Sequence, residues 1–329
     1  MSENMNREPG LKKQLNPMHV WAIAFGCIIG WGSFVNPGKK FLPNSGAAGT
    51  AIAMVLGALV MIIIAFSYAY MIPKYPEAGG EFTFTKHCFG KNLAYLCGWF
   101  LVAAYLTNVP MNSTAIGLIV DGLDGSADIL KFGFHYTIAG FEGYMGEMIF
   151  AMGILVLFGI LNILGVEKAG FVQTILSSLL AFCAVTLCVS ALVSSKASGI
   201  NLEPVWGFDK SAAVAANATM ENISDFAHVG NRSILSAILA TFAIAPWAFV
   251  GFDTIPQAAE EFRFSYKKVM LIMVIAILFG AFVYISNNTV AAAALKNWPE
   301  QGVKMTLSEH SLPRLAENIK FIHNLGFKH

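Results

Sequence analysis

Seven apolar runs, each long enough to cross the roughly 30 Å hydrocarbon core of a bilayer, constrain the fold of this 329-residue chain more than any other feature. Within lipid every backbone polar group needs an internal partner, so segments of this kind form helices. Hydrophobic residues make up 56% of the chain and charged residues 12%, which lies outside the composition of soluble domains. The sequence therefore predicts an all-α integral membrane protein with about seven spans, near residues 18–36, 48–72, 93–120, 146–165, 171–194, 233–256 and 269–294.

Lysine and arginine residues predict the orientation of these spans, because they are enriched in cytoplasmic loops. With the N-terminus inside, the inner segments hold 10 of them in 51 residues, and the outer loops hold 6 in 77. We therefore expect a cytoplasmic N-terminal segment at 1–17, an extracellular loop at 195–232 and an extracellular tail at 295–329. The net charge of +1 provides no field that would attract nucleic acid, so the lipid bilayer is the expected environment.

The first span contains the stretch "AFGCIIGWGSFVNPG", residues 24–38, in which three glycines crowd the middle of a membrane helix. Each interior glycine costs a helix roughly 0.8 to 1 kcal/mol relative to alanine. Two interpretations remain open for Gly26, Gly30 and Gly32. Small residues four positions apart permit close helix packing, whereas an unwound segment would expose N–H and C=O groups to a polar ligand.

The sixth span carries a second weak point, in "FAIAPWAFVGFDTIP" at residues 242–256. Pro246 removes a backbone donor and clashes with the preceding turn. Interrupted helices at matching positions of two halves indicate the binding site of a secondary transporter. We expect breaks near 29–33 and 244–251 that face each other across a cavity. Their free N–H and C=O groups would suit a substrate with a carboxylate and an ammonium.

Four motifs in this order resemble the amino acid-polyamine-organocation (APC) superfamily of permeases, over residues 16–290. They are "IIGWGSFVNPG", "YPEAGGEFTFTKHCFG", "NILGVEKAGFVQ" and "WAFVGFDTIPQAAEEF". The resemblance implies an inverted five-plus-five repeat, with the first repeat at 18–194 and the start of the second at 233–294. Because the family usually has twelve spans, we expect the chain to lack the eighth span onward.

The resemblance also implies a substrate site. Backbone N–H groups of Gly30, Trp31 and Gly32 would bind the carboxylate, and the carbonyls of Ile28, Trp247 and Val250 would bind the ammonium. Trp247 would cap the bound amino acid, the alternative being an interfacial anchor. The side-chain pocket maps to Ala103, Ala104 and Asn108, although Asn108 is equally explained by an interhelical hydrogen bond.

The sequence defines the coupling of transport to an ion or a second solute less well than it defines the substrate site. Leu180 replaces the lysine of proton-coupled relatives, and Phe100 replaces a gating tyrosine of the exchangers. Asp253 remains the candidate for proton linkage, with pairing to Lys267 or Lys268 as the alternative. The residues leave open whether the further partner is a proton or a counter-substrate.

These features predict a secondary active transporter that moves amino acids across the cytoplasmic membrane by alternating access. An amino acid/amine exchanger of the same fold is one alternative, and a non-transporting seven-helix receptor is another. A retinal protein is disfavoured because span 269–294 has no lysine. No metal, cofactor or enzyme activity is predicted, because the histidines lie at span ends or in loops.

Overall fold

The computed structural model describes residues 11–30, 32–121, 129–138, 141–193, 198–295 and 298–300. Five of its helices are long and apolar enough to span a bilayer, and they correspond to predicted spans two, three, four, five and seven. These are α3 (Leu42–Lys74), α5 (Lys91–Asp121), α6 (Met145–Ile163), α7 (Val166–Val193) and α11 (Val269–Ala294). The agreement is close because lipid requires unbroken backbone hydrogen bonding along each apolar run.

The first and sixth spans are each divided. The first consists of α1 (Pro17–Ile28), α2 (Gly32–Asn36) and the π-helical turn η1 (Pro37–Phe41). The sixth consists of α9 (Asn231–Ala248) and α10 (Thr254–Gln257). The structure therefore confirms two divided spans among longer helices, one of which, α3, is kinked near its start at Gly46.

The remaining elements are short and lie between the spans. They are α4 (Glu81–Phe89), α8 (Lys210–Ala215), η2 (Gly199–Leu202), η3 (Ile223–Phe226), η4 (Ala259–Glu261), η5 (Tyr266–Lys268), β1 (His135–Ile138) and β2 (Phe141–Tyr144). The two strands form an antiparallel hairpin, with His135 opposite Tyr144, in the loop between spans three and four. This hairpin is a small departure from the expected all-α fold.

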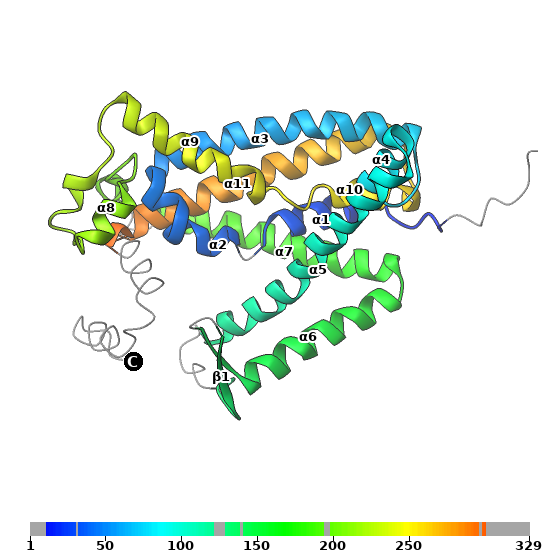
Figure 1. Cartoon of the computed structure of the whole chain (residues 1–329), viewed down its shortest axis with the longest axis horizontal. Helices are drawn as coiled ribbons and strands as arrows, with labels where there is room; N and C mark the ends of the chain where they lie inside the picture. Colours follow the sequence, from blue (N-terminus) through cyan, green and yellow to red (C-terminus); the bar gives the residue numbers. More distant parts are fainter. Residues whose placement is uncertain are drawn as a thin grey trace, which may run out of the picture.

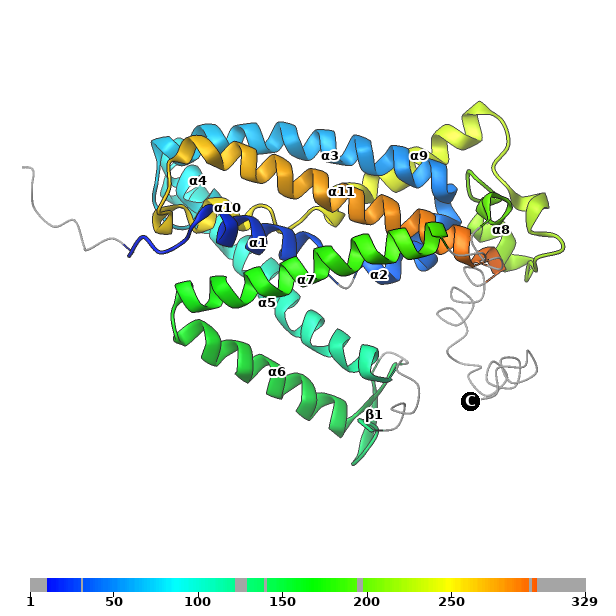
Figure 2. The same cartoon turned by 180° about the vertical axis from the view of Figure 1, so that it is seen from behind.

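The core lies where α3, α9 and α11 run side by side, with α1 and α7 against them (Figures 1 and 2). Small residues bring α3 and α9 close together, because a Cβ added to Gly57 would lie 2.7 Å from the Cβ of Ala245. Such contacts stabilise membrane helix pairs, for which burial in lipid gives no driving force. Phe25, Phe249 and Tyr284 fill the space around the two divided spans.

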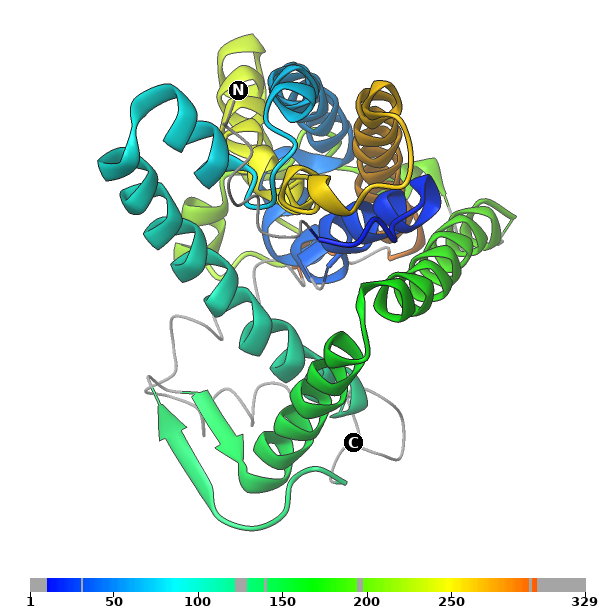
Figure 3. The same ribbon diagram turned by 90° about the vertical axis from the view of Figure 1, so that its right-hand side faces the viewer.

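Helices α5 and α6 lean away from this core as a separate pair (Figure 3). Most side chains of α5 are exposed, including Trp99 at 63%. Its neighbours in the structure are chiefly α4 and α6. The third span therefore approaches the divided spans with only part of its length.

The polar segment at 198–230 packs on the far end of α3, together with the first residues of the tail. Trp298 is buried, and its Nε1 donates to the carbonyl of Asn201 at 2.8 Å. Phe208 lies in the same buried cluster. The rest of the predicted extracellular tail, 301–329, lies outside the described residues. The domain boundaries and the sidedness remain predictions.

Candidate functional site

The first break lies where the glycine pattern predicts it. Helix α1 begins at Pro17, with the side chain of Asn16 accepting a hydrogen bond from the N–H of His19 at 2.8 Å. It ends at Ile28, and α2 begins at Gly32. Ile29 and Gly30 are not helical, and Trp31 lies outside the described residues. The predicted interruption near 29–33 is confirmed.

Gly26 has a different role, although it belongs to the same glycine-rich stretch. A Cβ there would lie 2.1 Å from Nε2 of Gln173 and 2.7 Å from Oγ of Ser177, both on α7. The Ser177 hydroxyl donates to the carbonyl of Ala22 at 2.7 Å. Both interpretations of the glycines therefore hold, at different residues: Gly26 permits close helix packing, and Gly30 lies in the break.

The second break is displaced from the predicted range of 244–251 to residues 249–253. Pro246 lies inside α9, which continues to Ala248. The N–H of Phe249 then donates to Pro246 at 3.1 Å, and the N–H of Val250 to Trp247 at 3.2 Å, so the last turn tightens. Gly251 follows with a φ of 123°. The glycine reverses the chain here, in a conformation that side chains disfavour, and the proline only precedes it.

The second break packs at Gly251 directly against the end of α1, where we expected a cavity between the two breaks. A Cβ on Gly251 would lie 2.4 Å from the Cβ of Cys27 and 3.0 Å from the nitrogen of Ile28. The indole of Trp247 lies over the start of α2, 3.0 Å from the position of a Cβ on Gly32. Segments more than 200 residues apart in the sequence therefore form one site.

The chain itself provides partners for the free carbonyls of the breaks. Tyr284 on α11 donates to Ile28 at 3.4 Å, and the nearby Asn287 donates to the carbonyl of Ser33 at 3.3 Å. The carbonyl of Gly30 accepts from the Ser33 hydroxyl at 2.8 Å. Such partners permit non-helical backbone at membrane depth.

Comparison with known proteins agrees with this architecture. Residues 15–300 match the model of a family described as amino acid permease. The chain belongs to the amino acid permease family. It is consequently a multi-pass membrane protein of the APC-type fold, and the proteins that it matches are transporters and permeases rather than enzymes.

Three relatives illustrate the range of this family. "Cationic amino acid transporter 2, vacuolar" of Arabidopsis thaliana is 23% identical over 310 residues, covering 92% of this chain and 44% of the relative. "Branched-chain amino acid permease BcaP" of Bacillus subtilis is 24% identical, covering 88% and 56%. "Serine/threonine exchanger SteT" of B. subtilis is 26% identical, covering 50% and 34%. The chain spans about half the length of the first two relatives.

Two of the pocket residues mapped to the third span, Ala103 and Ala104, are exposed on α5, and Asn108 is half-buried. The carbonyl of Asn108 accepts a hydrogen bond from the side chain of Asn112 at 2.9 Å. Asn112 faces the first break, with its Oδ1 3.7 Å from the position of a Cβ on Gly30. Asn112 was not predicted from the sequence, although its place one turn after Asn108 on the same helix face could have indicated it.

Asp253 makes two hydrogen bonds, neither of them to a lysine. Its Oδ1 accepts from the N–H of Gly251 at 2.7 Å, and its Oδ2 accepts from the hydroxyl of Tyr105 on α5. The side chain of Gln257 donates to the Tyr105 oxygen at 3.1 Å. Tyr105 was not predicted. It provides a hydroxyl on the third span, where Phe100 lacks one.

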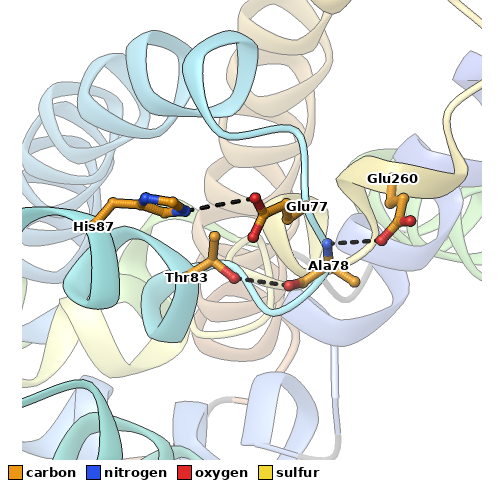
Figure 4. A network of polar contacts seen from close by, with 5 residues as sticks. All are labelled: Glu77, Ala78, Thr83, His87 and Glu260. Atoms are coloured by element: carbon orange, nitrogen blue, oxygen red, sulfur yellow. Dashed lines mark hydrogen bonds and ion pairs between the residues drawn. The ribbon is translucent and has the colours of Figure 1, made fainter. Parts of the chain in front are cut away.

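Loop residues drawn in Figure 4 connect neighbouring segments at the N-terminal end of the bundle. One carboxylate oxygen of Glu260 accepts from the N–H of Leu11 at 2.8 Å, and the other from that of Ala78 at 3.2 Å. Glu77 pairs with His87 at 3.6 Å. Glu260 therefore ties the N-terminal segment and the turn before α4 to the end of the sixth span.

Proposed function

We propose that the full-length protein is a secondary transporter that moves a zwitterionic amino acid across the cytoplasmic membrane by alternating access, with its N-terminus in the cytoplasm. One observation carries the proposal. Two divided spans meet at their interruptions, where Gly251 of the second break packs against Cys27 and Ile28, the last residues of α1 before the first break. A discontinuous pair of this kind is the characteristic binding element of secondary transporters.

The substrate backbone would bind between the breaks. The N–H groups of residues 30–32 would receive the carboxylate at the start of α2, where the helix dipole favours negative charge. The carbonyls of Ile28, Trp247 and Val250 would receive the ammonium. Trp247 is 52% exposed and lies over Gly32, a position from which its ring can close over a ligand.

The preferred substrate is an amino acid whose side chain is neutral or modestly polar. The mapped pocket offers Ala103, Ala104 and Asn108, to which the structure adds Asn112 near Gly30. A cationic side chain would need a counter-charge, and Asp253 is already hydrogen-bonded to Tyr105 and Gly251. The names of the relatives include branched-chain, serine/threonine and cationic amino acids, so the choice rests on the pocket and requires a direct test.

The test is uptake of labelled amino acids into proteoliposomes that hold the full-length protein. Trp247→Ala removes the proposed lid, and Gly32→Val places atoms within 3.0 Å of the Trp247 ring and of the Asn36 side chain. We expect each variant to lower uptake roughly tenfold or more, equivalent to about 1.4 kcal/mol. Trp99→Ala, at an exposed tryptophan of α5 outside the site, is the matched control and should retain uptake.

Several outcomes would revise the proposal. Undiminished uptake in both site variants, or no uptake of any amino acid by the wild type, would refute the proposed site. Preferential uptake of arginine or lysine would overturn the substrate class alone. Uptake that requires preloaded internal amino acid would identify an exchanger.

A further inference from the structure

Glu81 is held against the end of the sixth span by the turn that precedes α4. The N–H of Gly79 donates to the carbonyl of Gln257 at 3.3 Å. Gly80 has a φ of 48°, and a Cβ there would lie 3.0 Å from Cγ of Gln257 and 3.2 Å from its nitrogen. Because the two backbones are this close, the carboxylate at the first position of α4 cannot move away from α10 without separating the two segments.

Both carboxylate oxygens of Glu81 are buried, and neither has a partner in hydrogen-bond geometry among the residues that the structure describes; the side chains of Tyr68 and Gln257 are its polar neighbours. The titratable groups that face it are Tyr68 on α3, Tyr105 on α5 and Asp253 in the second break, and all of them are acids. Burial is the main cause that raises the pKa of the Glu81 carboxyl above its usual range, and the charge of Asp253 adds to the shift.

Asp253 lies in the opposite kind of environment. Its two oxygens accept hydrogen bonds from a backbone N–H and from the Tyr105 hydroxyl, so both have partners in the structure. A second negative charge on Glu81 would be costly, because a buried carboxylate loses its hydration. Of these two neighbouring carboxyls, Glu81 is the buried one whose oxygens lack partners in hydrogen-bond geometry among the described residues.

We propose that Glu81, and not Asp253, carries the proton that this protein exchanges with the solution on its N-terminal side. The proposal rests on the transport function proposed above and assigns its coupling group. With a proton on one oxygen, Glu81 is neutral and remains buried between α4, α3 and α10. When the O–H bond breaks, the proton passes to water and leaves a carboxylate, which requires hydration. Separation of α4 from α10 would supply that hydration and open the N-terminal side of the site.

The sign of the pH dependence follows. A carboxyl whose pKa is higher in the packed arrangement than in the separated one binds its proton more tightly when packed. The stabilisation is therefore complete below the usual pKa of glutamate and is lost as the pH rises through the raised value. Lower pH favours the packed arrangement, and higher pH favours separation.

The first experiment measures thermal stability in nanodiscs from about pH 5 to about pH 8 and needs no substrate. The variants are Glu81→Gln, Asp253→Asn and, as the matched control, Glu77→Gln, an exposed glutamate of the same loop. The wild type and Glu77→Gln should lose Tm as the pH rises. Glu81→Gln mimics the protonated side chain, so its pH-dependent loss should be less than half as large.

The second experiment measures uptake by the same proteins with and without an imposed pH gradient, together with acidification of a trapped pH-sensitive dye. In Glu81→Gln the gradient stimulation and the dye signal should be lost, while amino acid exchange without a gradient persists. An unchanged pH dependence of Tm together with retained stimulation would overturn the assignment. Loss of stimulation in Asp253→Asn but not in Glu81→Gln would transfer the proton to Asp253. No uptake by the wild type would refute the transport function alone, and the Tm comparison would still decide the protonation of Glu81.

Discussion

Gly251→Ala is expected to destabilise the protein by several kcal/mol and to abolish amino acid uptake. The residue has a φ of 123°, and a left-handed backbone costs other residues about 1–2 kcal/mol. The added Cβ would also lie 2.4 Å from the Cβ and 2.7 Å from the carbonyl carbon of Cys27. Relief of that overlap costs typically 1–3 kcal/mol more and moves the two breaks apart. Heating in detergent followed by size-exclusion chromatography measures the loss of folded protein.

Gly230→Ala is the matched control for this substitution. Gly230 has a φ of 83°, yet nothing lies within 4 Å of an added Cβ. It therefore reports the cost of the backbone alone, and uptake should survive. Equal loss of stability in both variants would show that the contact between Gly251 and the end of α1 contributes nothing, which would contradict the geometry on which the site is built.

Gly46→Ala is expected to release the 198–230 segment from α3, with a loss of stability as large as that at Gly251. Gly46 interrupts α3 with a φ of 62°. A Cβ would lie 2.1 Å from the carbonyl oxygen of Val205 and 2.5 Å from the nitrogen of Gly207. Both neighbours are backbone atoms, which cannot rotate away as a side chain can. The carbonyl of Val205 would also lose its bond to the N–H of Ala48, now 3.2 Å long.

Limited proteolysis of the 198–230 segment, together with Tm, measures this effect. Gly199→Ala is the control, because Gly199 lies in the same segment with open space around it. The control should resist protease as the wild type does, while Gly46→Ala is cut faster. Protection that is the same in both variants would contradict the docking of this segment at Gly46.

The positions of the spans could be predicted from the sequence to within a few residues. The seventh predicted span, 269–294, coincides with α11, and the fourth, 146–165, differs from α6 by one or two residues at each end. The first break was also predictable, because the cost of glycine in a helix is local. The second break lies later in the chain than predicted. The prediction followed Pro246, which interrupts the sequence pattern, whereas the close approach of Cys27 requires a glycine at position 251.

The sequence by itself determined that the chain lies in a membrane, how many spans cross it and which two of them are weak, since each of these properties depends on neighbouring residues along one helix. Only the tertiary structure decided which side chains meet at the breaks. It placed Asn112 against Gly30 and paired Tyr105 with Asp253. It also buried Glu81 beside Tyr105 and Asp253. Helices in lipid are apolar around their whole circumference, so hydrophobic periodicity does not indicate which face meets the protein. The rotation of each helix is set by its contacts with partners far away in the chain, and these contacts fix the chemistry of the site.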